Sequence, residues 1–398
     1  MTLIPELGLD VPSTWNVETL ESVTSKIGSG ATPRGGSSVY VESGPALIRS
    51  QNVYDHQFKT DGLVFLSSEA ASALRGVTVE KNDVLINITG DSILRVTTVP
   101  ETILPARVNQ HVAIVRSNGK VDPGYLQKWL SLPLMKDFML GHSAGGTRKA
   151  VTKGHLQSFP IPVPPIPEQR AIAAALGALD DKIESNRRII DLIPRFVRSQ
   201  VDSVTISESA TIPVSDLATF TNGGAYTKGA SGTGRMVIRI AELNSGPGSS
   251  TVYNDIEVPD EKTARAGDIL MAWSGSLGVH RWHRDEAIIN QHIFKVVPTG
   301  YPSWLVFDRL EAIMPVFRAL AADKATTMGH INRGHLTTTA VALPTAATIA
   351  RLDAKLAPLW KRLLLAEQEV LQLARLRDTL LPELLSGRIR VPIEEVKA

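Results

Sequence analysis

The stretch Ile172–Val197, IAAALGALDDKIESNRRIIDLIPRFV, repeats its apolar residues at alternating spacings of four and three, with charged residues on the flanks. Such a sustained heptad pattern is typical of a helix that pairs with another helix, because the apolar seam is narrow. We expect a helix over about 168–200. It would be roughly 50 Å long at ~1.5 Å per residue, and Pro194 should bend or shorten it.

A second helix with the same spacing is predicted over 346–385, with Pro358 and Pro382 inside it. Two seams with nothing else to cover them should pack on each other, and they can do so as an antiparallel coiled coil if the chain between them folds back. The alternative is that each helix packs on its own domain. The predicted interface consists of Ile172, Leu176, Leu179, Ile183, Ile190, Ile193, Leu352, Leu356, Leu359, Leu363, Val370, Leu373 and Leu380.

Outside these helices the chain repeats itself in order. Arg49 returns as Arg239, and NDVLINITG (82–90) returns as GDILMAWSG (267–275). The tripeptide Asn109-Gln110-His111 returns unchanged as Asn290-Gln291-His292, and Lys153-Gly154-His155-Leu156 returns as Arg333-Gly334-His335-Leu336. A repeat this long indicates two whole domains, each with its own core.

Each copy reads as short β-branched strands separated by Gly, Asn, Pro and Asp, followed by a short helical stretch (123–140, interrupted at Pro133, and 304–320). The proline-rich run 160–167 is predicted to be an extended, stiff linker. The fold class is therefore α+β: two repeated mixed α/β domains, each followed by a long helix. The predicted division is 1–165 (first module), 166–205 (central helix), 206–345 (second module) and 346–398 (C-terminal helix and tail).

Composition describes an ordinary globular protein of 398 residues, 43% hydrophobic and 21% charged, with no cysteine. No apolar run is long enough for a membrane span and no signal peptide is evident, so a cytoplasmic location without membrane contact is expected. The net charge of +2 gives no support to DNA binding by itself. A near-neutral chain can still bind DNA if its cations lie on one face, or if partner subunits supply the remaining contacts with DNA.

The search for catalytic chemistry finds no assembled site. Gly141–Gly145, GHSAG, matches a hydrolase nucleophile elbow, but a helical stretch precedes it and the residues that follow are not expected to be helical. A P-loop match over 141–148 lacks its lysine, and the histidines are scattered singly, so neither a phosphate loop nor a metal site is expected. The rival class is a serine hydrolase using Ser143 with His155 and Asp180.

Polar residues near the repeated framework are candidates for DNA contact, because Asn, Gln and Arg can read base edges and basic groups can bind phosphates. Those shared by the modules serve either internal scaffolding or contact with DNA, whereas those that differ are the better candidates for discrimination. The first-module candidates are Arg49, Gln51, Asn52, Asn87, Thr89, Asn109, Gln110, His111, Thr147, Arg148 and Lys149. The second-module candidates are Arg239, Glu242, Ser274, Ser276, Arg281, Asn290, Gln291, His292, His330 and Arg333.

Taken as a set, these pieces resemble the specificity subunit of Type I restriction-modification systems. The resemblance rests on GSGATP (28–33), the D-[VI]-L strand with its following TG or SG, and Asn-Gln-His. It also rests on the segment Pro165–Ile183 and on the ending Leu380–Ile389, LLPELLSGRI. It covers nearly the whole chain in family order.

The resemblance implies a noncatalytic subunit whose two target-recognition domains each read one half of an asymmetric, split DNA target. It implies that the paired helices fix the spacing and dock two modification subunits, which bind S-adenosylmethionine. Motor-nuclease subunits, which use ATP and Mg²⁺, join for cleavage, and no cofactor is expected in this chain. The second copy departs from the pattern, because it has Leu343-Pro344-Thr345-Ala346 in place of the PxPEQ entry. A further alternative is that the chain is a duplicated scaffold protein that binds no DNA.

Overall fold

The computed structural model describes residues 1–142, 150–205, 210–322 and 329–392. The chain forms two compact units, Met1–Glu184 with Gln372–Ala398, and Ser185–Leu371. The long helices α6 (Ile166–Thr205) and α10 (Ala346–Leu385) each contribute residues to both units. The four-part division proposed from the sequence is a division along the chain, and it stays a prediction.

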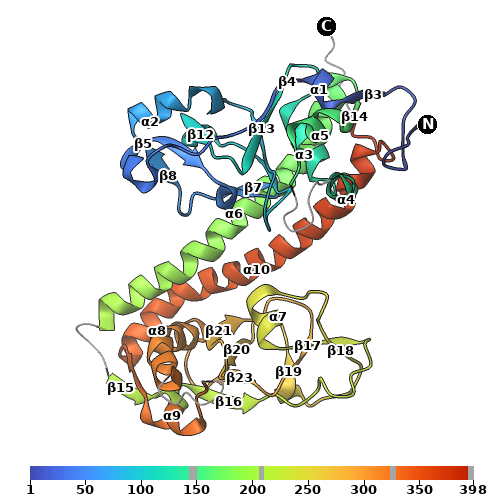
Figure 1. The fold of residues 1–398 in the computed structure, drawn as a ribbon. Helices are drawn as coiled ribbons and strands as arrows, with labels where there is room; N and C mark the ends of the chain where they lie inside the picture. The colour runs from blue at the N-terminus through green and yellow to red at the C-terminus, as the bar shows by residue number, and fades with distance from the viewer. Residues whose placement is uncertain (143–149, 206–209, 323–328, 393–398) are drawn as a thin grey trace. The chain divides into compact units, whose positions relative to one another are not determined.

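The first module contains two four-stranded sheets (Figure 1). In one sheet the strand order is β11-β10-β13-β4 and every pairing is antiparallel. In the other the order is β8-β5-β12-β9, with a parallel pairing between β5 and β12. Their bounds are β4 Thr24–Ser29, β5 Tyr40–Ile48, β8 Val64–Leu66, β9 Thr78–Val79, β10 Val84–Asn87, β11 Val96–Thr98, β12 Ala106–Val108 and β13 Val112–Ser117.

The second module repeats this topology strand for strand. Its sheets run β21-β20-β23-β16 and β18-β17-β22-β19, again with one parallel pairing, between β17 and β22. The predicted duplication is therefore confirmed at the level of the backbone. The bounds are β16 Ala218–Asn222, β17 Arg235–Ile238, β18 Tyr253–Asn254, β19 Thr263–Ala264, β20 Ile269–Ala272, β21 Gly278–Arg281, β22 Ala287–Ile289 and β23 Ile293–Pro298.

Short two-stranded pairings complete both modules. In each, the strand that leads into a long helix pairs with a strand near the start of the module: β14 with β3, and β24 with β15. The remaining pairs are β1 with β2 and β6 with β7. The bounds are β1 Thr2–Ile4, β2 Leu9–Val11, β3 Asn16–Thr19, β6 Val53–Tyr54, β7 Gln57–Phe58, β14 Pro160–Val163, β15 Ala210–Pro213 and β24 Ala340–Leu343.

The proline-rich run differs from the expected linker in two ways. Its first four residues are strand β14, paired to β3, so they belong to a sheet. Helix α6 begins at Ile166, before the run ends at Pro167. A proline in the first helical turn is compatible with the helix, because the amide hydrogen it lacks would have no partner there.

The shorter helices start where the sequence provides caps. Asp122 accepts hydrogen bonds from the Gly124 and Tyr125 amides at the start of α3, and Pro133 opens α4, as the predicted break requires. Buried Trp129 and Tyr125 anchor α3 in the first core. The bounds are α1 Leu20–Val23, α2 Ser68–Ala73, α3 Pro123–Ser131, α4 Pro133–Gly141, α5 Lys153–Ser158, α7 Ile240–Ser245, α8 Ser303–Ala322 and α9 Arg333–Thr338.

The repeated Lys/Arg-Gly-His-Leu motif is a helix start. Thr152 Oγ1 accepts a hydrogen bond from the amide of His155 at 3.2 Å, and Asn332 Oδ1 accepts one from the amide of His335 at 3.1 Å. Each histidine Nδ1 accepts in return from the amide of its cap residue, which completes a capping box. The recurrence of this motif is therefore explained by local backbone structure in both modules.

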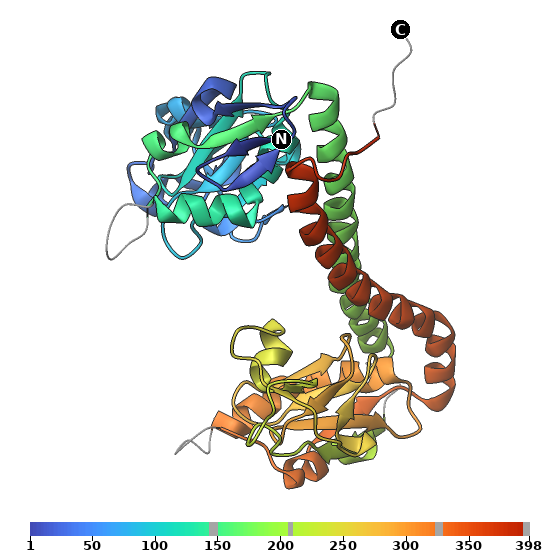
Figure 2. The same ribbon diagram turned by 90° about the vertical axis from the view of Figure 1, so that its right-hand side faces the viewer.

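Both long helices run without a break through their internal prolines. Helix α6 continues past Pro194 to Thr205, so Pro194 does not shorten it, and α10 has the bounds predicted from its spacing. Figure 2 shows α10 changing direction in its N-terminal third, the part of the helix that contains Pro358. A proline inside a helix removes one backbone hydrogen bond and crowds the preceding turn, which favours such a bend.

The helices contact each other within each unit. In the first, Asp180 pairs with Arg377 at 3.0 Å, and Leu176 shares a buried cluster with Leu381. In the second, Asn186 donates to Glu369 at 2.8 Å and Lys355 donates to Gln200 at 2.8 Å. Partner numbers fall along α10 as they rise along α6, so the contacts within each unit are antiparallel. The detailed coiled-coil packing stays a prediction.

Most of the predicted seam is buried, as the spacing requires. Ile172, Leu176, Ile183, Ile193, Leu352, Leu356 and Leu363 are buried, and Leu179, Ile190, Leu359, Val370, Leu373 and Leu380 are half-buried. The alternative raised by the sequence, packing of each helix on its own domain, holds for part of α10, and the coiled coil stays a prediction. For example, Leu352, Leu356 and Leu363 share one cluster with Trp304 and Leu310 of α8, so the seam also packs on the module.

Candidate nucleic-acid interface

A hydrogen-bonded histidine recurs at the same place in both modules. Nδ1 of His111 lies 2.6 Å from Thr89 Oγ1, and its Nε2 lies 3.0 Å from Gln110 Nε2. Because an amide nitrogen can only donate, Nε2 accepts and Nδ1–H donates to the threonine. In the second module Ser274 Oγ lies 3.1 Å from His292 Nδ1 and Gln291 Nε2 lies 3.3 Å from His292 Nε2.

The asparagine of the same tripeptide has a different role. Asn109 and Asn290 are buried, and their Oδ1 atoms accept hydrogen bonds from the amides of His111 and Gln291 at 3.1 and 2.8 Å. The asparagines therefore stabilise the turn, while Gln110, His111 and Gln291 lie at its surface, with His292 half-buried. Of the two roles that the sequence left open, the structural one applies to the asparagines, and contact of Gln110, His111, Gln291 and His292 with DNA stays a prediction.

The loops that carry these residues are held together in the same way in both modules. Thr89 forms an isolated antiparallel bridge with Ala150, and Ser274 forms one with His330. The two modules therefore share this bridge, but the residue that pairs with the hydroxyl residue differs. It is a small alanine in the first module and an exposed histidine in the second. His330 lies near Trp273, with ring centroids 6.5 Å apart.

The repeated arginines contact their own loops. The Arg49 side chain donates to the carbonyl of Gly62 at 2.5 Å, and its amide donates to Asn52 Oδ1 at 3.0 Å. Arg239 pairs with Glu242 at 2.6 Å. Burial pushes the pKa of Glu242 up, but hydrogen bonds from Arg239 outweigh it, and the pKa lies below its ordinary value. Glu242 is thus a buried residue whose negative charge is compensated by Arg239.

Two further asparagine candidates are buried. Asn52 donates to the carbonyl of Lys59 at 2.9 Å, and Asn87 donates to the carbonyl of Ser50 at 3.0 Å. Both side chains close the loops around them and are fully covered. Gln51 and Thr89, by contrast, line a surface cavity of about 590 Å³ together with His111.

Arg281 lies in the joint between the second module and α10. Its guanidinium pairs with Glu367 at 2.6 Å, donates to the carbonyl of Trp360 at 3.0 Å and stacks over the Trp360 ring. Burial lowers the pKa of Arg281 and raises that of Glu367. Ser276 and Arg333 are exposed. Thr147, Arg148 and Lys149 lie outside the described residues.

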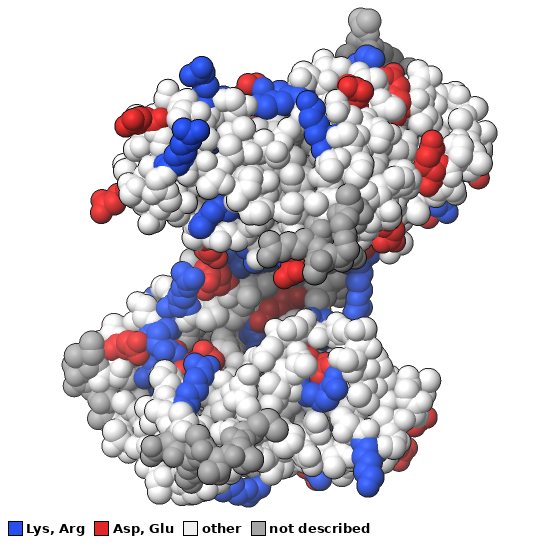
Figure 3. Space-filling view, in the orientation of Figure 1, with Lys and Arg blue, Asp and Glu red and all other residues white. Residues whose placement is uncertain are grey.

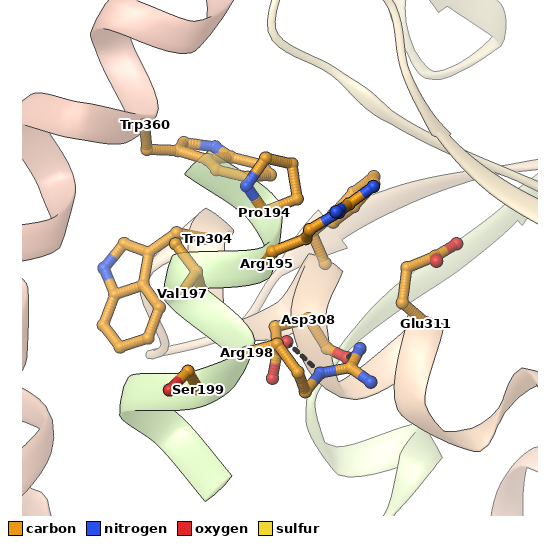
Figure 4. A pocket seen from close by; sticks show the side chains of 10 residues that line it. Pro194, Arg195, Val197, Arg198, Ser199, Trp304, Asp308, Glu311 and Trp360 are labelled. Carbon is orange, nitrogen blue, oxygen red and sulfur yellow. Dashed lines mark hydrogen bonds and ion pairs between the residues drawn. The ribbon is translucent and has the colours of Figure 1, made fainter. Parts of the chain in front are cut away.

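The same joint contains a cavity of about 390 Å³ between α6, α8 and α10 (Figure 4). Its lining includes Trp304, Trp360 and Pro194, and the Arg198 side chain reaches Asp308 across it. Burial raises the pKa of the nearby Glu311. This largely apolar cavity belongs to the packing of the module on its helices.

Charges of both signs are mixed on one face of the molecule (Figure 3). On the face drawn in Figure 3, Lys and Arg side chains are interspersed with Asp and Glu. This matches the small net charge of +2. A face with charges of both signs, as in Figure 3, gives no direct indication of a phosphate-binding surface.

The residues proposed for the rival hydrolase do not form a triad within the described chain. Asp180 pairs with Lys128 and Arg377, whereas the His155 side chain caps α5. Ser143 lies outside the described residues. Among the described residues no group of His, Cys, Asp or Glu side chains could hold a metal ion, and no helix is long and apolar enough to cross a membrane.

Sequence reasoning missed two clusters. One is the buried group His56, Lys128, Asp180 and Arg377, which joins three helices and a loop. The other is Tyr54 with Lys59 and Arg95, whose cationic groups lie 4.1 and 4.4 Å from its ring centroid. Neither cluster has a counterpart in the repeated motifs, and contacts between residues far apart in the chain, such as Arg95 with Tyr54, leave no local signal.

Comparison with known proteins identifies the first module. Residues 12–195 match the model of the Type I restriction modification DNA specificity domain. Over these residues the chain is similar to the DNA specificity domain of Type I restriction-modification systems. It is 42% identical over 82 residues to a putative type I restriction enzyme MjaX specificity subunit of Methanocaldococcus jannaschii, covering 20% of this chain and 19% of that protein.

A second relative is the EcoBI specificity subunit of Escherichia coli, 30% identical over 154 residues, 36% of this chain and 31% of that protein. These matches span less than a third of either relative. The fold is similar to the crystal structure of a Type I S subunit from M. genitalium, with a TM-score of 0.63 at 14% identity over 96% of this chain and 99% of that one. That likeness confirms the predicted fold class.

Proposed function

We propose that this chain is the DNA-specificity subunit of a Type I restriction-modification complex and recognises an asymmetric, bipartite target. The observation that carries the proposal is the duplication: two modules with one strand order, the same buried turn asparagines and the same hydroxyl–histidine–glutamine chain, but different side chains beside it. A common framework with different surroundings suits two readers of different half-sites.

In this proposal the chain itself performs no chemistry. Two modification subunits bind S-adenosylmethionine and methylate adenine, and motor-nuclease subunits with ATP and Mg²⁺ join for cleavage. The assembly would act in the cytoplasm. The long helices α6 and α10 would dock the modification subunits and set the gap between half-sites. Their seams are covered within each unit, which leaves the charged flanks of both helices for partners.

The direct test expresses the full chain with the modification subunits of its host and maps methylated adenines in the genome. We expect one motif of two different half-sites separated by a fixed gap. A continuous motif, or no methylation that depends on this chain, would overturn the proposal.

A module exchange tests the division of labour. Residues 20–160 are replaced by the corresponding region of a related subunit, and methylation is mapped again. One half-site should change while the other half-site and the gap persist. A change in both halves, or in neither, would contradict the modular reading.

A further inference from the structure

The hairpin next to the repeated histidine differs in length between the modules. Strand β10 pairs Ile86 with Val96 of β11, and β20 pairs Met271 with Val279 of β21. Ile86 and Met271 hold equivalent places, since they pair with β13 and β23 at Ala113 and Phe294. Between these paired residues the chain runs through 87–95 in the first module and 272–278 in the second, so the connection is two residues longer in the first.

Arg95 is the last residue of the longer connection. Its backbone is fixed, because its amide donates to Ser92 and its carbonyl accepts from the Asn87 amide at 2.9 Å. Its counterpart next to Val279 is Gly278. The second module therefore offers no side chain at this place, and a β-carbon there would lie only 3.0 Å from the His280 ring.

The Arg95 guanidinium is held over an aromatic ring. It lies 4.4 Å from the centroid of Tyr54, and Nζ of Lys59 lies 4.1 Å from the same centroid. Within the described chain neither cation has a carboxylate within ion-pair distance. Stacking restrains the guanidinium while leaving its N–H edge free to bind. Two uncompensated cations at one ring indicate a site for a group rich in hydrogen-bond acceptors.

Tyr54 and Arg95 line the cavity of about 590 Å³ that the repeated histidine also lines, whereas Lys59 is outside this lining. Its lining includes Gln51, Tyr54, Asp91, Arg95 and His111. The cavity therefore combines a part that both modules share, Thr89 with His111, and a part that only the first module has. Shared groups suit features common to all DNA, such as phosphates. Groups present in one module suit the bases that distinguish its half-site.

We propose that Arg95 reads a guanine in the half-site of the first module, with Tyr54 positioning it; this rests on the DNA-reading function proposed above. A guanidinium presents two parallel donors that match O6 and N7 of guanine in the major groove. Lysine cannot reproduce that fork, whereas it can replace arginine at a phosphate.

The test uses the full chain in complex with its modification subunits. Methylation is mapped for the wild type, Arg95→Ala and Arg95→Lys, with Arg75→Ala as a control at an exposed arginine of the same module outside the cavity lining. Both Arg95 variants should relax one guanine of the first half-site, with discrimination falling roughly 5- to 100-fold. The second half-site, the gap and the control should keep the wild-type motif.

Binding to duplexes supplies an independent measurement. Replacing the assigned guanine by 7-deazaguanine removes the N7 acceptor, so wild-type binding should weaken while Arg95→Ala, which no longer uses N7, should not change. An unchanged motif, a uniform loss at every sequence, or full rescue by Arg95→Lys would overturn the inference and point to phosphate contact. A wild type that yields no gapped motif would instead overturn the proposed function.

Discussion

Arg281 of β21 and Glu367 of α10 form an ion pair at 2.6 Å, and the Arg281 side chain is only 2% exposed. The pair joins the sheet of the second module to the long helix that follows it. The guanidinium is further enclosed by the Trp360 ring and carbonyl. Each charge is compensated mainly by the other in a largely buried joint, so stability is sensitive to loss of either partner.

Removing the carboxylate should destabilise the second unit. Glu367→Ala leaves Arg281 charged and buried, at a cost of about 3–5 kcal/mol in unfolding free energy. The matched control is Asp191→Ala, which breaks the exposed pair with Arg195 and should change stability by less than about 0.5 kcal/mol. Urea unfolding of both variants checks the difference. Equal midpoints for the two would contradict the assigned role.

Stability should depend on pH through His56. Burial lowers its pKa to about 4, against the opposing attraction of Asp180, with Lys128 and Arg377 adding to the lowering. The Gln127 amide donates to Nδ1 at 3.2 Å, which requires a neutral ring. The unfolded chain binds the proton more readily, so the contribution is complete above about pH 6.5 and is lost as pH falls toward 4.

The His56 contribution amounts to roughly 3 kcal/mol over that window. Urea unfolding between pH 4.5 and 7.5 measures it, with His56→Asn for comparison, because asparagine tolerates the positive φ of 58° at this position. In the variant, the unfolding free energy should lose most of its dependence on pH in this range. Parallel pH profiles for wild type and variant would show that other groups are responsible.

The repeated capping boxes should contribute equally in the two modules. Thr152→Ala and Asn332→Ala each remove the acceptor for an amide at the start of a helix, which should cost about 1 kcal/mol in unfolding free energy. Lys153→Ala, at the exposed neighbouring position, serves as the control and should be close to neutral. A large effect in only one module would mean that the motif has another role there.

The Asn-Gln-His motif should separate into structural and binding parts. Asn109→Ala leaves the amide of His111 without its acceptor and should cost about 1–3 kcal/mol of stability. Gln110→Ala at the surface should leave stability unchanged and weaken DNA binding by the complex without altering the motif, since both modules carry the residue. Thermal unfolding checks the stability of Asn109→Ala, and salt titrations of DNA binding check Gln110→Ala. Altered sequence preference in Gln110→Ala would contradict a shared contact.

Much of the fold follows from local pattern. The spacing of apolar residues predicted α10 over 346–385, and Pro133 predicted the break between α3 and α4. The duplicated motifs predicted one topology used twice. These predictions succeed because periodicity, proline chemistry and repetition are encoded in neighbouring residues and need no knowledge of distant contacts.

Prediction of the site was less complete. Asn52, Asn87 and Arg281 look like solvent-facing polar residues in the sequence, but each is buried against a partner. Glu367 is far from Arg281 along the chain, and no local rule pairs them. Conversely, Tyr54, Lys59 and Arg95 acquire their shared environment only when β6, β7 and the β10–β11 turn come together.

The sequence by itself determined the duplication, the helical seams and the absence of a recognisable catalytic motif, because each is a property of residue order. Only the tertiary structure decided which polar side chains are enclosed and which remain at the surface. Burial depends on the packing of segments far apart in the chain. A buried asparagine and an exposed glutamine in one tripeptide differ only in that packing.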